Sequence, residues 1–246
     1  MATRNIKLTI AYDGSGYHGW QAQPMQPTIQ GILTDALFAL TSQQISTKGA
    51  SRTDAGVSAL GQQVLFTIDS PIPTENFQKA LNDRLPKNIA VTEAAEVPDD
   101  FDVISDVTSK LYRYTISTAK TRPVLSIDHA WHLPYKLNQL AMDSAAKLLV
   151  GTHDFKSFAS AADNRTNSVR TIFGCNVIGE NELIHIDTEG SGFLYNMVRN
   201  IVGTLVEIGI GRWKPQIINH ILAAKDRTAA GPIAPPQGLC LMWIKY

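Results

Sequence analysis

The most informative stretch of this chain, for its fold as for its chemistry, is Gly49-Ala50-Ser51-Arg52-Thr53-Asp54-Ala55-Gly56-Val57. Its small residues leave little side-chain bulk, so a ligand can approach the backbone and meet Arg52 and Asp54 as the only charged groups. A carboxylate in that setting can act as a nucleophile or as a general base. The same pattern also fits an aspartate that caps a turn beside a structural arginine, so spacing alone leaves both interpretations open.

Patterns of strand and of helix alternate on both sides of this stretch. Apolar residues at every second position predict half-buried strands. Apolar residues at helical spacing after a threonine predict capped helices. The strands are expected at 6–11, 64–68 and 89–94, the helices at 28–40 and 74–85, and a loop rich in glycine and aromatic residues at 12–20.

The second half repeats this alternation of element types. Strands are expected at 110–117 and 239–246, a hairpin at 171–178 and 183–189 that turns at 179–181, and helices at 138–149, 193–208 and 215–222. The regular glycine-ended rhythm of a doubly wound parallel sheet is missing. We therefore expect an α+β protein of two similar lobes, 1–105 and 106–246, whose mixed, largely antiparallel sheets form a central cleft.

Composition limits the class of protein. Of the 246 residues, 44% are hydrophobic and 18% are charged, which is typical of a compact globular chain and excludes a disordered one. The two cysteines, Cys175 and Cys240, lack the spacing of a zinc site and are expected to be reduced thiols. Because we find no signal-peptide pattern and no apolar run of membrane-span length, we expect a cytoplasmic protein without a membrane segment.

Charge is balanced in total but uneven along the chain. The net charge is zero, with 22 basic and 22 acidic residues. Residues 69–106 hold nine acids and three bases, whereas 110–122 hold four bases and no acid. A neutral protein with segregated charge can still present a basic surface to a polyanion. These charge runs fit solvated faces equally well.

Arg52-Thr53-Asp54-Ala55-Gly56-Val57 resembles the catalytic motif of the tRNA pseudouridine synthase A family, and further segments match that family in the same order. Together they span nearly the whole chain, which makes the resemblance specific. The other segments are Tyr12-Asp13-Gly14 through Tyr17-His18-Gly19-Trp20-Gln21-Ala22-Gln23, Pro98-Asp99-Asp100-Phe101, Tyr112-Arg113-Tyr114, His153-Asp154-Phe155-Lys156-Ser157-Phe158, Phe193 through Met197-Val198-Arg199-Asn200-Ile201-Val202-Gly203, Ala224-Lys225-Asp226-Arg227 and Gly238-Leu239.

The resemblance implies the pseudouridine synthase fold and an isomerase that converts uridine to pseudouridine in the anticodon stem-loop of tRNA, at positions 38–40. In such enzymes the uridine is flipped out, its C–N glycosidic bond is broken, and the uracil is rotated and rejoined to the ribose through carbon. The reaction involves no redox change and no hydrolysis, so neither a cofactor nor a metal is implied. The resemblance also implies a homodimer, with each tRNA contacting both subunits.

Site residues carry over by position. The resemblance makes Asp54 the nucleophile, Tyr112 the residue that stacks on the target base and helps remove its proton, and Arg199 the partner that keeps Asp54 ionised. From the residues alone, Tyr112 also fits an ordinary half-buried strand tyrosine, and Arg199 also fits a pair with Glu207 or a side chain that reaches solvent. Arg52 is expected to contact the RNA or to fill the gap left by the base. Further candidates for phosphate contacts, each of which also fits a solvated surface charge, are Lys110, Arg113, Lys120, Arg122, Arg165 and Arg170.

Three positions depart from the family pattern. Ser58 stands where the family usually has histidine, Asp102-Val103-Ile104 where a basic residue is common, and Cys240 where an aromatic one is common. Two other functions remain open. One is a catalytically silent tRNA-binding protein on the same fold. The other is an aspartate-dependent hydrolase, although we find no second catalytic carboxylate or oxyanion signature at recognisable spacing.

Overall fold

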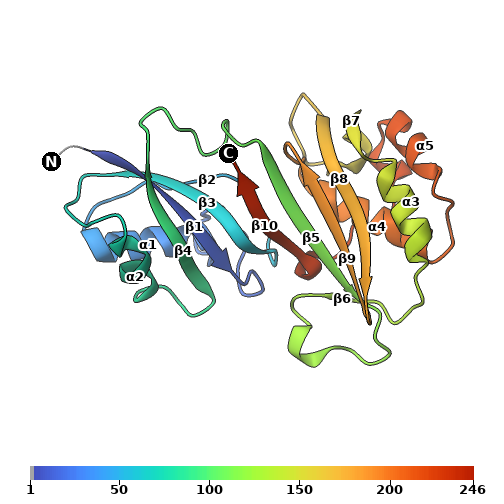
Figure 1. Cartoon of the computed structure of the whole chain (residues 1–246), viewed down its shortest axis with the longest axis horizontal. Helices are drawn as coiled ribbons and strands as arrows, with labels where there is room; N and C mark the ends of the chain where they lie inside the picture. Colours follow the sequence, from blue (N-terminus) through green and yellow to red (C-terminus); the bar gives the residue numbers. More distant parts are fainter. Residues whose placement is uncertain (1–2) are drawn as a thin grey trace. The chain divides into compact units, whose positions relative to one another are not determined.

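The computed structural model describes residues 3–246, which form two compact units (Figure 1). The first unit holds the residues up to Thr108 together with Leu241–Tyr246, and the second holds Ser109–Cys240. The division expected from the sequence lies after residue 105 and keeps the whole last strand in the second lobe. Among residues 3–246, no helix has the length and apolar character needed to cross a bilayer.

The first unit is a sheet with two helices. Its strands lie in the order β4-β1-β3-β10, and short β2 pairs with β3. Strand β1 is antiparallel to both β3 and β4. The elements are β1 (Arg4–Tyr12), α1 (Ile29–Thr41), β2 (Lys48–Gly49), β3 (Ser58–Ile68), α2 (Asn76–Asn82), β4 (Ile89–Val97) and β10 (Leu239–Lys245).

Alternation along β1 places its apolar residues on the face that α2 covers. Ile6 and Leu8 are fully buried, and Ile6 pairs with Phe66, whose ring meets the edge of Phe77 from α2 at 5.8 Å. Helix α2 is shorter than the 74–85 expected from the sequence. It ends at Asn82, whose side-chain amide binds both backbone polar groups of Val91 in β4, at 2.7 and 2.9 Å.

The second unit is also a sheet with helices. Its strands lie in the order β5-β9-β8-β7, each antiparallel to its neighbour, and short β6 runs parallel to β5. The prediction of an α+β fold with mixed, largely antiparallel sheets is therefore confirmed. The elements are β5 (Ser109–Ser117), η1 (Val124–Ser126), β6 (Trp131–His132), α3 (Gln139–Lys147), β7 (Gly151–Asp154), η2 (Lys156–Phe158), β8 (Val169–Glu180), β9 (Leu183–Gly190), α4 (Met197–Gly209), α5 (Ile217–Ala224), η3 (Arg227–Ala229) and η4 (Pro236–Gly238).

Several boundaries in the second unit differ from expectation, and two of the differences have a clear cause in the backbone. The β8–β9 hairpin is longer than expected and turns at Asn181, whose φ of 55° suits the left-handed position of a tight hairpin turn. Helix α4 begins at Met197 instead of residue 193. Asn196 has a φ of 61°, so the helix cannot extend backwards through it, and the apolar residues before it lie in a loop.

Candidate active site

Asp54 lies in the turn between β2 and β3, held against the preceding loop. The backbone N–H of Trp20 donates to the carbonyl of Thr53 at 3.0 Å, and the N–H of Val57 donates to the carbonyl of Asp54 at 3.1 Å. The Asp54 side chain is half-buried and that of Arg52 is exposed. A carboxylate and a guanidinium on one rigid turn are thus both within reach of a ligand.

Two glycines allow the 12–20 loop to approach this turn closely. A Cβ on Gly14 would lie 2.1 Å from the carbonyl oxygen of Val57, and one on Gly19, whose φ is +85°, would lie 2.7 Å from that of Thr53. Ser58 contributes to the same contact, because its buried Oγ accepts the N–H of Gly14 at 3.0 Å. The serine that departs from the family pattern therefore has a structural role here.

In the second unit, Tyr112 lies on the helix-facing side of β5. Its side chain is only 6% exposed, and its ring meets the ring of Phe193 edge-on at a centroid distance of 5.3 Å. Phe193 belongs to the loop between β9 and α4. The loop between β9 and α4 therefore sets the orientation of Tyr112.

Asp163 and Arg165 hold that loop in place. Arg165 donates from Nη1 to the carbonyl of Phe193 at 2.7 Å. Asp163, which is 9% exposed, accepts the backbone N–H of Tyr195 at 2.7 Å and that of Arg165 at 3.1 Å. Burial alone would raise the pKa of the Asp163 carboxyl, but these hydrogen bonds and the charge of Arg165 hold it below its usual value. From the sequence, Arg165 was a candidate phosphate contact, which stays a prediction, and Asp163 was not named.

The charge of Arg165 acts on two other cations of the second unit, and we call the three the basic cluster: Lys110, Arg165 and Arg170. Burial lowers the pKa of Lys110 to about 8, and the charge of Arg165 adds to that effect. Burial, and then Arg165, also lowers the pKa of Arg170. Cations gathered in this way favour an anion nearby. Asp163 supplies one, because its Oδ1 lies 3.7 Å from Nε of Arg165 and its charge opposes the lowering of the Arg170 pKa. Lys110 precedes Tyr112 by two residues and therefore shares its face of β5.

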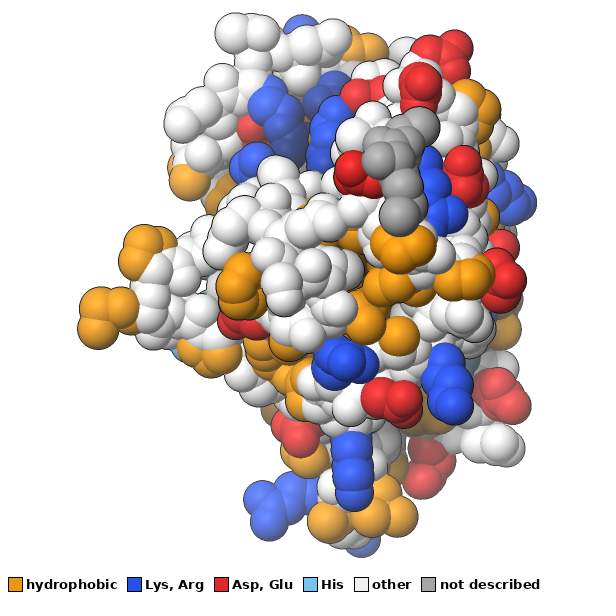
Figure 2. Space-filling model, turned by 90° about the vertical axis from the view of Figure 1, so that its left-hand side faces the viewer, with side chains coloured by type: hydrophobic (Ala, Val, Ile, Leu, Met, Phe, Trp, Pro, Cys, Tyr) orange, Lys and Arg blue, Asp and Glu red, His pale blue; other side chains and the backbone are white. Residues whose placement is uncertain are grey.

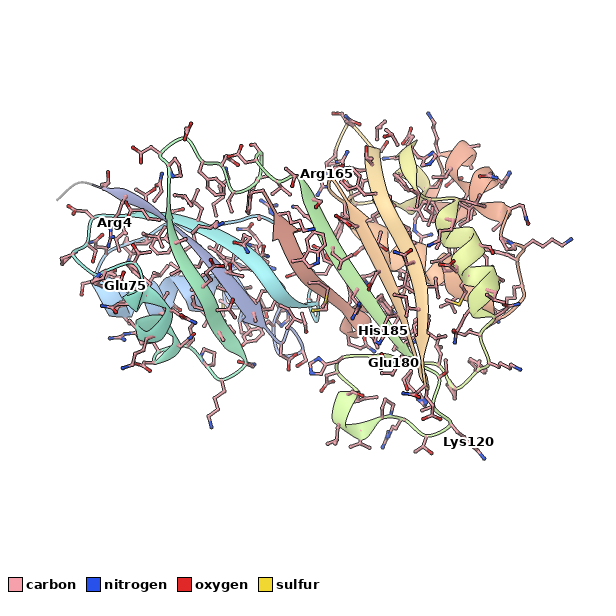
Figure 3. The ribbon with its side chains drawn as sticks, in the orientation of Figure 1. Arg4, Glu75, Lys120, Arg165, Glu180 and His185 are labelled. Atoms are coloured by element: carbon pink, nitrogen blue, oxygen red, sulfur yellow. The ribbon has the colours of Figure 1, made fainter. Side chains whose placement is uncertain are left out.

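The structure separates Arg113 and Lys120 from this cluster. Arg113 points to the opposite face of β5, where it makes a bidentate pair with Asp187 through two bonds of 2.7 Å that raise its pKa. Figure 3 shows Lys120 at the other end of the second unit from Arg165. Strand β5 alone carries the chain roughly 24 Å from Lys110 to Ser117 at about 3.4 Å per residue.

Arg199 lies in the first turn of α4. Its Nε donates to the carbonyl of Ala234 at 2.8 Å, and its Nη1 donates to the side-chain oxygen of Asn196 at 3.1 Å. Glu207, which the sequence left open as a partner, instead accepts from Arg212 at 2.9 Å. The bonds to Ala234 and Asn196 fix the plane of the Arg199 guanidinium.

Asp102, one of the departures from the family pattern, also has a local structural role. Its Oδ1 accepts the N–H groups of Ile104 and Ser105 at 2.8 Å each, and it forms an ion pair with Lys48, which lowers its pKa.

Figure 2 shows acidic and basic side chains interspersed over the face that it draws. Within residues 3–246, no three His, Cys, Asp or Glu side chains gather in a group that could hold a metal ion.

Known proteins resemble this chain over its whole length. A family model described as tRNA pseudouridine synthase matches residues 8–106 and 145–246. The tRNA pseudouridine synthase A of Caldicellulosiruptor saccharolyticus is 44% identical over 243 residues, covering 99% of this chain and 100% of that protein. That of Geotalea daltonii is 44% identical with the same coverage, and that of Moorella thermoacetica is 45% identical, covering 98% of this chain and 99% of its own.

Proposed function

Because this chain belongs to the tRNA pseudouridine synthase family, we propose that it converts uridine to pseudouridine in the anticodon stem-loop of tRNA, at positions 38–40, with Asp54 as nucleophile. Isomerisation of tRNA uridine follows from the family match. The observation that carries the more specific proposal is the Arg52–Val57 motif on a rigid turn, with the carboxylate of Asp54 half-buried. We place the protein in the cytoplasm.

Each proposed role suits the setting of its side chain. The Asp54 carboxylate adds to the flipped-out nucleotide and the C–N bond breaks. C5 of the rotated uracil then bonds to the ribose, the Asp54 carboxylate leaves, and C5 loses its proton, which Tyr112 helps to remove. Arg52, exposed on the same turn, contacts the RNA beside the extruded base. Tyr112 stacks on the base, a contact that contributes roughly 1–3 kcal/mol. Its ring is held for this by Phe193.

The basic cluster is proposed to bind phosphates next to the target uridine. Extruding a base costs a few kcal/mol, which contacts to neighbouring phosphates must offset. Lys110 shares the face of Tyr112, so a phosphate at the cluster lies next to the base that Tyr112 stacks on. Arg113 and Lys120 remain proposed contacts for other parts of the tRNA.

The test is tritium release from tRNA labelled at C5 of uridine. Formation of the carbon–carbon bond expels the C5 hydrogen, so release counts turnovers directly. We expect release from tRNA and none from free uridine. A catalytically silent binding protein would retain tRNA without releasing tritium, and a small-substrate hydrolase would act on nucleosides whether or not RNA was added.

Affinity for tRNA is expected to fall as pH rises through the pKa of Lys110, about 8. Only the protonated ammonium attracts phosphate, so from pH 7 to pH 9.5 the dissociation constant should rise roughly 3- to 10-fold at fixed salt. Filter binding at constant ionic strength measures this change. Lys110→Arg is the matched control, because its guanidinium stays charged and its profile should be flat. A flat wild-type profile would contradict the role of Lys110.

Rising pH has the opposite effect on folding stability, because the pKa of Lys110 is lower in the folded protein than in the unfolded chain. In the unfolded chain Lys110 keeps its proton up to the ordinary value of 10.5, so between pH 8 and 10.5 the folded state binds fewer protons. The contribution of Lys110 to stability therefore increases with pH across that window and is lost as pH falls to about 8.

We also propose a homodimer, supported by exposed apolar side chains on β8 and at the start of α3. Gly179 faces α3, because a Cβ there would meet the Gln139 side chain, so the neighbouring Ile178 points to the other face of β8, away from that helix. Sedimentation velocity should give about twice 26.9 kDa, and Ile178→Glu should shift the protein towards monomer while Ile104→Glu, in the first unit, should not. A monomeric wild type at micromolar concentration would refute the proposal. The exposed apolar side chains that support the homodimer are Leu140 on α3 and Val169, Phe173 and Ile178 on β8.

A further inference from the structure

Buried polar side chains lie directly beneath the Asp54 turn. The hydroxyls of Tyr12 and Thr53 share a hydrogen bond of 2.8 Å, and these residues are only 4% and 6% exposed. Gln62, which is fully buried in β3, donates from Nε2 to the carbonyl of Ser51 at 2.6 Å and accepts the N–H of Ser51 at 3.1 Å through Oε1. The side-chain amide of Gln62 thus bonds both backbone polar groups of Ser51, as the backbone of a neighbouring strand would.

Tyr12 and Gln62 satisfy polar atoms of the Asp54 turn, which apolar residues of similar size would not do. They also fix the direction of those atoms. Gln62 fixes both backbone polar groups of Ser51, and Tyr12 fixes the side chain of Thr53, whose carbonyl already accepts from Trp20.

We propose that Tyr12, Thr53 and Gln62 are positioning residues that set the orientation of Asp54 for its attack on the nucleotide. This inference rests on the proposed role of Asp54 as nucleophile. Ser51 and Thr53, three and one residues before Asp54, are held by the network, so the Asp54 backbone has little freedom to rotate. A displacement of about 1 Å at a reacting group can cost about 100-fold in rate.

The experiment compares variants that lose one hydroxyl and keep their shape. Tyr12→Phe and Thr53→Val each remove the shared hydrogen bond, whereas Thr53→Ser keeps it. Tyr246→Phe is the matched control, because its hydroxyl binds the Val103 carbonyl elsewhere in the first unit. For each variant we would measure the single-turnover rate of tritium release, the tRNA dissociation constant and the melting temperature.

Tyr12→Phe and Thr53→Val are expected to react about 10- to 100-fold more slowly than wild type, with tRNA dissociation constants within about twofold. Thr53→Ser should restore most of the rate, and Tyr246→Phe should match wild type. The double variant should be no slower than the slower single variant, because both remove the same hydrogen bond. A merely structural role would lower the melting temperature and leave the rate of the folded enzyme unchanged.

Asp54→Asn, measured beside them, separates the two proposals. If Asp54→Asn is inactive while Tyr12→Phe and Thr53→Val react at the wild-type rate, the positioning inference is overturned and the proposed nucleophile stands. If Asp54→Asn turns over as wild type does, the proposed nucleophile is overturned and the positioning inference falls with it. Loss of rate and of tRNA affinity in equal measure would also overturn the inference.

Discussion

Asp54→Asn will release no measurable tritium from tRNA labelled at C5 of uridine, while it binds tRNA as tightly as wild type. The asparagine has the same size and fits the same turn, but its amide oxygen is a poor nucleophile. Removal of a nucleophile typically lowers the rate at least about 10⁴-fold. Because the side chain is half-buried and the turn is held by its backbone, folding should be unaffected.

Three measurements make this result decisive. Single-turnover release and filter binding separate chemistry from affinity, and a melting curve shows that the variant is folded. Asp100→Asn, the same change at an exposed position of the first unit, should behave as wild type. Release by Asp54→Asn above a hundredth of the wild-type rate would remove Asp54 from the role of nucleophile.

Periodicity predicted most elements well, and its errors have local causes. It identified β1, α1 and β5 because each buries one face, so that apolar residues recur at the period of the element. It began β3 at Val64 instead of Ser58, because Gln62 and Gln63 interrupt the alternation. Those polar residues in an otherwise apolar strand were the one available signal for the network beneath Asp54.

Other features depend on contacts that no local pattern encodes. The apolar residues from Phe193 to Tyr195 continue the pattern of α4, yet they lie in a loop that Asp163 and Arg165 hold from a distant part of the chain. Side chains alternate along a strand, so Lys110 and Arg113 lie on opposite faces of β5. The strand pattern could not show that Arg113 is engaged by Asp187.

Arg199→Met is expected to lower the single-turnover rate about 10²- to 10³-fold, with tRNA affinity reduced no more than about threefold. If Arg199 acts in the chemistry, its charge matters most in the transition state and little for binding the RNA. Ala234 and Asn196 orient the guanidinium by accepting from its Nε and Nη1. Methionine keeps an unbranched apolar stem but none of the five donors of arginine.

Two further variants test whether charge or geometry matters in Arg199. Arg199→Lys keeps the charge but loses the planar fork, so it should recover only part of the rate. Arg212→Met is the matched control, because Arg212 follows the same helix and pairs with Glu207 at an exposed position. Rate and affinity that fall together in Arg199→Met would identify Arg199 as a residue that binds the RNA. A selective fall in rate is the outcome that only a role in the chemistry explains, because removing a group that binds RNA in the ground state weakens binding as well.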